Sequence, residues 1–256
     1  MRLAGGEIED LPLLEENSFL PDYSKVAPDK ARESKLLFLN YPNNPTAAVA
    51  TPEFFKETVA FAREHKICVA HDFAYGTIGF DGHQPESFLK TEGAKETGIE
   101  FFTLSKSHNM AGWRIGFAVG NPSVIQAINL LQDHTSVSLY GGIQKAGAAA
   151  LRDDQSSVRE LTAIYEERRN LFLKALSPSG LKTTQTRGSF YVWLKIPETF
   201  NAEDFMDKLA HEARVFTAPG DGFGSQGEGY LRIGLTQPAD RLIEAGRRIA
   251  SLAPFS

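Results

Sequence analysis

Four short apolar runs dominate the first half of the chain, and each is closed by polar or turn-forming residues. They cover residues 35–40, 67–70, 101–104 and 115–120. Short apolar runs bounded in this way are typical of buried β-strands. Between the first two runs, Thr51 and Pro52 have the pattern of a helix N-terminus. Strands that alternate with helices predict an α/β fold whose mostly parallel sheet is flanked by helices on both faces.

The second half of the chain has a different pattern. Long helices are expected over residues 122–144 and 157–176, with the charged stretch 166–169 on a solvated helix face. Beyond residue 180 we expect a strand over 189–196, a helix over 202–214, a strand over 230–235 and a helix over 238–252. These elements predict a smaller α+β domain. The expected division is a large domain over residues 1–150 and a small C-terminal domain over residues 151–256.

Polar side chains follow the ends of three predicted strands. Asn44, Asp72 and Lys106 occupy these positions. In open α/β sheets, ligands bind at the carboxyl ends of the strands. We therefore expect an amide, a carboxylate and an amine to converge on one ligand site.

Composition limits the classes of partner. The 256 residues carry a net charge of -5, which gives no reason to expect a nucleic-acid partner. No apolar run approaches the ~20 residues that a membrane-spanning helix needs, and residues 1–7 do not resemble a secretory signal. The single cysteine, Cys68, favours a reducing compartment, so a cytoplasmic location is expected. The histidines show no metal-binding spacing, and no metal is expected.

Four motifs, in order along the chain, resemble those of class I/II pyridoxal-phosphate-dependent aminotransferases, which have the aspartate-aminotransferase-like fold. The motifs are Asn40–Thr46, His71–Tyr75, Thr103–Gly116 and Tyr230–Ile233. Residues 11–21 are similar to those of the diaminopimelate-aminotransferase-type subgroup, while methionine or aromatic substrates stay open. The resemblance implies an enzyme that moves an amino group between an amino acid and a 2-oxo acid, and a homodimer.

The resemblance also implies roles for the residues at the strand ends. Lys106 would hold pyridoxal phosphate as a Schiff base and then move the substrate proton. Asp72 would pair with the pyridine nitrogen and keep it protonated. Tyr75 and Asn44 would hydrogen-bond the 3-oxygen of the cofactor ring. The catalytic group is therefore expected to be Lys106, Asp72 and Tyr75.

Further residues are expected to bind the phosphate and the substrate. Arg114 fits the phosphate-binding arginine of the family, and the hydroxyls of Thr103 and Ser105 are expected beside it. For Ser105, a plain turn role at the strand end stays open. An arginine inside an apolar strand, such as Arg232, needs a partner. The resemblance implies that Arg232 binds the substrate carboxylate and that Asn44 also takes part in substrate binding, while a structural salt bridge of Arg232 stays open.

The chain also departs from the family. Full-length relatives carry well over a hundred residues before the point that matches residue 10, so residues 1–150 would form only part of the cofactor-binding domain. We expect an uncovered apolar sheet surface and weak or no activity without a complementary segment. Ala47 stands where the family has glycine. A β-lyase on the same fold and a non-catalytic fragment remain as alternatives.

Overall fold

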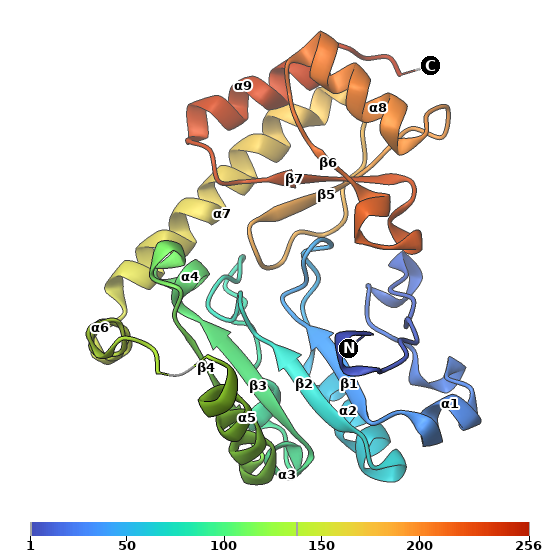
Figure 1. Cartoon of the computed structure of the whole chain (residues 1–256). Coiled ribbons are helices and arrows are strands. Elements are labelled where there is room, and N and C mark those ends of the chain that lie inside the picture. Colours follow the sequence, from blue (N-terminus) through green and yellow to red (C-terminus); the bar gives the residue numbers. More distant parts are fainter. Residues whose placement is uncertain (1, 137, 256) are drawn as a thin grey trace.

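The computed structural model describes residues 2–136 and 138–255. Two sheets form its framework, one with four strands and one with three. Figure 1 shows the two sheets one above the other, with the long helix α7 (Ser156–Leu176) running beside both. Within the described residues, no helix combines the length and apolar character needed to cross a bilayer.

The larger sheet consists of consecutive strands. Its order is β1 (Leu36–Asn40), β2 (Cys68–Asp72), β3 (Gly98–Thr103) and β4 (Gly116–Gly120). The first three strands run parallel, whereas β4 is antiparallel to β3. The sheet is therefore mostly parallel, as predicted, and the carboxyl ends of β1, β2 and β3 meet at one edge.

Helix α2 (Pro52–His65) covers one face of this sheet. The expected cap is confirmed, because the Thr51 side chain accepts a hydrogen bond from the amide of Phe54 at 3.1 Å. Phe54 and Phe55 belong to the same buried cluster as Leu37 of β1. The other helices of this half are α1 (Pro28–Glu33), α3 (Ala94–Thr97), α4 (Leu104–Ser107), α5 (Pro122–Thr135) and α6 (Gly141–Arg152).

The smaller sheet is antiparallel. Strand β7 (Tyr230–Gly234) lies between β5 (Tyr191–Lys195) and β6 (Ala218–Pro219). Figure 1 shows α7, α8 (Ala202–Lys208) and α9 (Ala239–Ala250) together along one side of this sheet, and a π-helical turn over Leu209–Ala213 continues α8. The segment that follows β2 also enters this core, because Ile78 and Phe80 belong to its buried cluster. The division at residues 150 and 151 stays a prediction.

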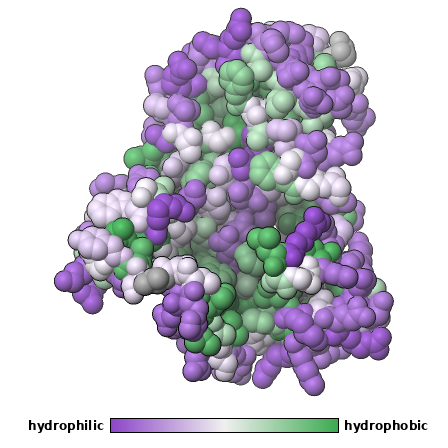
Figure 2. Space-filling model, viewed as in Figure 1, coloured by the Kyte–Doolittle hydropathy of each residue, from purple (hydrophilic) through white to green (hydrophobic). Residues whose placement is uncertain are grey.

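The outer strands of the larger sheet are partly uncovered. Leu36 and Phe38 of β1 are 43% and 51% exposed, and Phe117 and Val119 of β4 are 39% and 43% exposed. Figure 2 shows apolar side chains gathered in the lower half of the molecule. The expected uncovered apolar surface is confirmed, and the expectation of helices over both whole faces is wrong at these strands.

Two helix predictions need correction. The helix expected over 122–144 is two helices, because α5 ends at Thr135 and α6 begins at Gly141. The stretch 166–169 is not a solvated face, because Arg169 is only 5% exposed. It lies on the side of α7 that also buries Tyr165 and Phe172. An arginine at that helical position needs partners inside the protein.

Arg169 finds these partners in the loop after β2 and in the segment before β5. Its two terminal nitrogens donate to the carboxylate oxygens of Asp81 at 2.7 and 2.6 Å, and Nη1 also donates to the carbonyl of Thr186 at 2.9 Å. Its guanidinium carbon lies 4.8 Å from the ring centroid of Phe80. These hydrogen bonds hold the pKa of Asp81 below its usual value. Arg169 therefore ties α7 to the segment that follows β2.

We expect Arg169→Met to destabilise the protein by about 2–3 kcal/mol, because it leaves the Thr186 carbonyl buried without its donor. The loss is limited because the Asp81 side chain is 64% exposed and can bind water. Arg168→Met is the matched control, since the contacts from Arg168 to backbone carbonyls are 3.3 and 3.5 Å long. Urea unfolding measures both variants. Equal, small effects would show that Arg169 does not hold α7 in place.

Candidate active site

The parallel register brings two of the predicted site segments side by side. Asn40 at the end of β1 pairs with Asp72 at the end of β2, and Asp72 pairs with Phe101 of β3. Asn44 lies in the loop after β1, and Lys106 lies on α4 directly after β3. The topology therefore delivers an amide, a carboxylate and an amine to the same edge of the sheet.

Asp72 is half-buried at this edge. Its Oδ1 accepts a hydrogen bond from the amide of Ala74 at 3.1 Å. Burial raises the pKa of Asp72, while the bond from Ala74 and the charge of His71 act in the opposite direction. A carboxylate in such a position gains from a cationic partner.

Arg232 reaches this edge from the smaller sheet. Its Nη1 donates to Asn44 Oδ1 at 2.8 Å, so one hydrogen bond joins β7 to the loop after β1. Its guanidinium carbon lies 4.3 Å from the ring centroid of Tyr191 and 4.5 Å from that of Phe223. Aromatic rings on the guanidinium and the Asn44 bond fix its orientation. The arginine expected to bind a substrate carboxylate is thus held next to Asn44.

Tyr75 is buried between the two groups. Burial raises its pKa strongly, and the neighbouring Tyr191 and Asp72 act in the same direction, whereas Arg232 acts against them. Its ring also meets the ring of Phe190 edge-on, with centroids 5.3 Å apart. The charges of Asp72 and Arg232 therefore both act on the pKa of Tyr75.

Lys106 approaches from the other side. Its Nζ lies 5.6 Å from the centroid of the Phe190 ring, and Phe190 also contacts Tyr75. Thr103 begins the short helix that carries Lys106, because its Oγ1 accepts a hydrogen bond from the amide of Ser105 at 3.1 Å. The Thr103 and Ser105 hydroxyl oxygens are 3.0 Å apart. Both hydroxyls thus lie beside the lysine.

The structure does not bring Arg114 onto this group. Arg114 is exposed, and its Nη1 donates to the carbonyl of Ala111 within its own turn at 2.9 Å. The residue after Arg114 contacts one of the two hydroxyls, because Thr103 Oγ1 donates to the carbonyl of Ile115 at 3.2 Å. A phosphate-binding role for Arg114 stays a prediction.

Three aromatic residues of this region were not predicted as site residues from the sequence. Tyr191 and Phe223 stack on Arg232, and Phe190 lies near both Tyr75 and Lys106. Tyr191 lies inside a predicted strand, but burial along β5 does not alternate, so no period-two pattern marked its side chain. Phe223 lies in a glycine-rich loop, where no periodicity exists to place it.

Comparison with known proteins places the chain in a family. The family described as "Aminotransferase class I and II" matches residues 1–249. The chain belongs to this family. It is 54% identical over 254 residues to the L-glutamine--4-(methylsulfanyl)-2-oxobutanoate aminotransferase of Bacillus subtilis, covering 99% of this chain and 64% of that protein.

Two further relatives agree with this assignment. The LL-diaminopimelate aminotransferase of Halothermothrix orenii is 43% identical over 247 residues, covering 96% of this chain and 64% of the relative. The apo structure of BacF from Bacillus subtilis superposes with a TM-score of 0.94 at 45% identity, covering 100% of this chain and 65% of BacF. This aminotransferase-family chain therefore spans about two thirds or slightly less of the length of these relatives.

The donors and acceptors of the region fit pyridoxal phosphate. A half-buried amine beside aromatic rings, at Lys106, suits the cofactor aldehyde. Among the described residues, no donor contacts Oδ2 of Asp72, so this oxygen is available for a protonated ring nitrogen. The hydroxyls of Thr103 and Ser105 suit phosphate oxygens. These residues could hold the cofactor.

The loop that carries Asn44 contains a strained residue at Ala47, where the family has glycine. Ala47 adopts a φ of 61° and is fully buried. Its carbonyl accepts hydrogen bonds from the amides of Arg187 and Gly188 at 3.3 and 3.2 Å. This family chain thus keeps the left-handed loop conformation with alanine, at a conformational cost of about 1 kcal/mol.

We expect Ala47→Gly to leave the free energy of unfolding within about 0.5 kcal/mol of the wild type. Relief of the left-handed strain offsets the loss of a buried methyl group and the greater freedom of unfolded glycine. Ala48→Gly is the matched control, because Ala48 is also buried but has no positive φ. It should lose about 1.5 kcal/mol. Equal losses in urea unfolding would contradict strain at residue 47.

Proposed function

We propose that this chain forms the greater part of a pyridoxal-phosphate-dependent aminotransferase that exchanges an amino group between an amino acid and a 2-oxo acid. The observation that carries the proposal is the bond between Arg232 and Asn44 at the edge where Asp72 ends its strand. This bond holds a carboxylate-binding group next to the expected cofactor site. The family membership supports the same reaction class.

Lys106 is the proposed catalytic amine. It would hold the cofactor covalently and, once the substrate amine replaces it, would move the proton at the substrate α-carbon. Bound pyridoxal phosphate supplies the electron sink that makes this proton acidic. The Phe190 ring near Nζ keeps water from one side of the amine and supports its position.

Asp72 and Tyr75 would orient and tune the cofactor. Asp72 would accept a hydrogen bond from the ring nitrogen and keep that nitrogen protonated, which relieves the cost of a buried carboxylate. Tyr75 and Asn44 would donate to the ring oxygen. Thr103 and Ser105, with Arg114, would bind the phosphate, for which Arg114 must turn away from Ala111.

Arg232 would bind the substrate carboxylate. A guanidinium presents two parallel N–H groups to a carboxylate, and the rings of Tyr191 and Phe223 limit its freedom to rotate. The aromatic rings also reduce competition from water. This arrangement selects substrates with a free α-carboxylate.

The names of the relatives suggest a substrate class. A relative at 54% identity is named for a sulfur-containing 2-oxo acid, and one at 43% is named for LL-diaminopimelate. The higher identity favours an oxo acid of the first kind. No observation favours elimination over amino transfer. A transaminase turns over only with an oxo-acid acceptor, whereas a lyase releases ammonia without one, so product analysis separates the two reactions.

The proposal includes the assembly and the setting of the enzyme. We propose a cytoplasmic homodimer, supported by the family resemblance and by the single cysteine, Cys68. The chain covers 64% of the relative named above. We therefore expect full activity only when a segment corresponding to the rest of the relatives is present.

Lys106→Ala should abolish covalent attachment of the cofactor. Borohydride reduction of the protein with pyridoxal phosphate fixes the cofactor on the amine that holds it, and peptide mass spectrometry locates the modified lysine. We expect modification at Lys106 and a fall in turnover of at least about 100-fold in the variant. Lys145→Ala, at an exposed lysine of α6, is the control. A fixed cofactor in Lys106→Ala, or at another lysine in the wild type, would refute the assignment.

Arg232→Lys should weaken substrate binding by about 10–100-fold, because a point charge replaces a bidentate and stacked guanidinium. The change of the cofactor absorbance during titration with an amino acid measures the affinity. The corresponding amine without a carboxylate should show no difference between variant and wild type. Arg248→Lys makes the same change at an exposed arginine and serves as control. An unchanged affinity in Arg232→Lys would remove the carboxylate role.

A further inference from the structure

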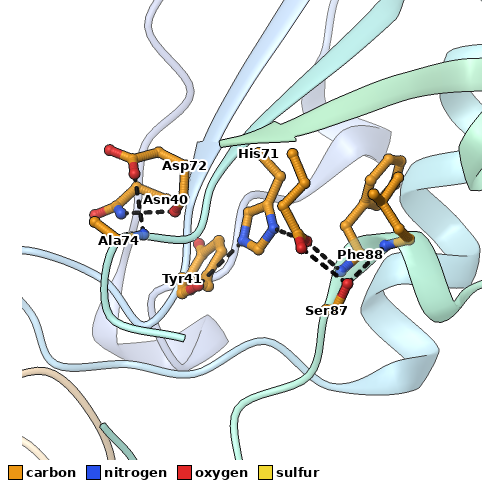
Figure 3. A network of polar contacts seen from close by, with 9 residues as sticks. Asn40, Tyr41, His71, Asp72, Ala74, Ser87 and Phe88 are labelled. Atoms are coloured by element: carbon orange, nitrogen blue, oxygen red, sulfur yellow. Dashed lines mark hydrogen bonds and ion pairs between the residues drawn. The ribbon is translucent and has the colours of Figure 1, made fainter. Parts of the chain in front are cut away.

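A buried histidine next to Asp72 lies between two hydrogen-bond acceptors. His71 is 0% exposed, with Nδ1 2.9 Å from Glu100 Oε2 and Nε2 3.1 Å from the carbonyl oxygen of Tyr41. Figure 3 shows the imidazole between Tyr41 and the carboxylate that also contacts Ser87 and Phe88. The chemistry proposed above does not use His71, so its contacts indicate a different role.

The hydrogen bonds of His71 and Glu100 indicate which of their atoms carry hydrogens. A carbonyl oxygen only accepts, so the Nε2 of His71 must carry a hydrogen. Glu100 accepts two further hydrogen bonds, from the amide of Phe88 at 2.8 Å and from the hydroxyl of Ser87 at 2.9 Å. Donors to both oxygens favour the ionised carboxylate. We infer from these contacts that the Nδ1 of His71 donates as well, so that the pair is an imidazolium bound to a carboxylate.

An ion pair of this kind is costly to bury. The rings of Phe55 and Phe73 lie around His71, with centroids 5.1 and 5.2 Å from its own, and Glu100 is only 6% exposed. Desolvation of two charges offsets much of their attraction, so a well-packed apolar pair would be about as stable. The ion pair therefore stabilises the fold no more than an apolar pair would. We look for its role in the segments that it positions.

The pair holds two site segments together. His71 binds the carbonyl of Tyr41, at the start of the loop that carries Asn44. In the opposite direction, Asn40 Nδ2 donates to the carbonyl of Asp72 at 2.9 Å, and Asn40 Oδ1 accepts from the amide of Asn44 at 2.9 Å. These crossed bonds connect the ends of β1 and β2, and Glu100 of β3 anchors them to a third strand.

Strand geometry explains why this anchor acts on Asp72. Successive side chains of a strand point to opposite faces, so fixing His71 on the side of α2 fixes the direction of Asp72 on the other side. His71 contacts the Phe55 ring of α2, which confirms the face it occupies. The positive imidazolium also opposes the rise that burial causes in the pKa of Asp72.

We propose that His71 and Glu100 are positioning residues, which hold Asp72 and Asn44 as one rigid unit facing the cofactor. The inference rests on the function proposed above. The ion pair does not touch the cofactor, and it acts through the backbone of β2 and of the loop after β1. The Ser87–Phe88 turn completes the anchor, because it supplies the other two donors to Glu100.

The protonation of His71 can be tested without any cofactor. In protein labelled with ¹⁵N-histidine, we expect both ring nitrogens of His71 to carry hydrogens at neutral pH, with the signal assigned by its loss in His71→Gln. His134, which is exposed on α5, gives the reference signal. A His71 signal with one unprotonated ring nitrogen would overturn the ion pair.

Glu100→Gln tests the positioning role. The variant keeps the shape but removes the charge, so hydrogen exchange should speed up by about tenfold or more at the amides of Asn44 and Ala74, which are bonded to Asn40 and Asp72. The amide of Val192 in the smaller sheet should not change. Uniform acceleration across both sheets, or none at Asn44 and Ala74, would overturn the proposal.

The affinity for pyridoxal phosphate adds a second readout. We expect Glu100→Gln to weaken binding by about tenfold. Ser87→Ala removes one donor to Glu100 without touching His71, and it should leave the affinity within about twofold. If Glu100→Gln binds the cofactor as tightly as the wild type, the positioning role is wrong. If the wild type itself binds no cofactor, the proposed function fails, while the exchange experiment still tests the anchor.

Discussion

The register between β1 and β2 is the constraint on which the rest of the site depends. It pairs Asn40 with Asp72, and the Asn40 side chain then bonds both the Asp72 carbonyl and the Asn44 amide. A shift by one residue would turn Asp72 toward α2 and His71 toward the ligand edge. The buried bonds of His71 to Glu100 and Tyr41 oppose such a shift. Local hydrogen bonds thus fix the position of the carboxylate for which we propose a chemical role.

The second sheet completes the site through contacts that are few and directional. Arg232 crosses to Asn44, and the aromatic rings of Tyr191 and Phe223 hold its guanidinium. Arg169 joins the same two halves further from the site, through its contacts with Asp81 and with the Thr186 carbonyl. We assign ligand recognition to the polar link at the site, whereas the link in α7 joins that helix to the loop after β2. Both depend on arginine because its planar group bonds several acceptors at once.

The sequence predicted the parts of the fold that local patterns encode. Thr51 caps its helix, Asp72 ends β2 and Lys106 lies directly after β3, because caps and strand ends have short-range signals. The end of α5 at Thr135 and the start of α6 at Gly141 were missed, because the sequence has helical periodicity in both segments. Arg169 was predicted to lie on a solvated face because its neighbours in the sequence are charged. Its helical spacing from Tyr165 and Phe172 nevertheless places it on the buried side of α7. The stacking of Phe223 on Arg232 was missed because Phe223 lies in a glycine-rich loop, where no periodic pattern indicates the direction of a side chain.

The central claim is that one amine, one carboxylate and one guanidinium surround a single cofactor. A crystal structure of the protein grown with pyridoxal phosphate tests this claim most directly. The account predicts continuous density from Lys106 Nζ to the cofactor, with the ring nitrogen at hydrogen-bond distance from Asp72 and an open face toward Arg232. Density for the cofactor at another lysine, or a ring nitrogen directed away from Asp72, would contradict it.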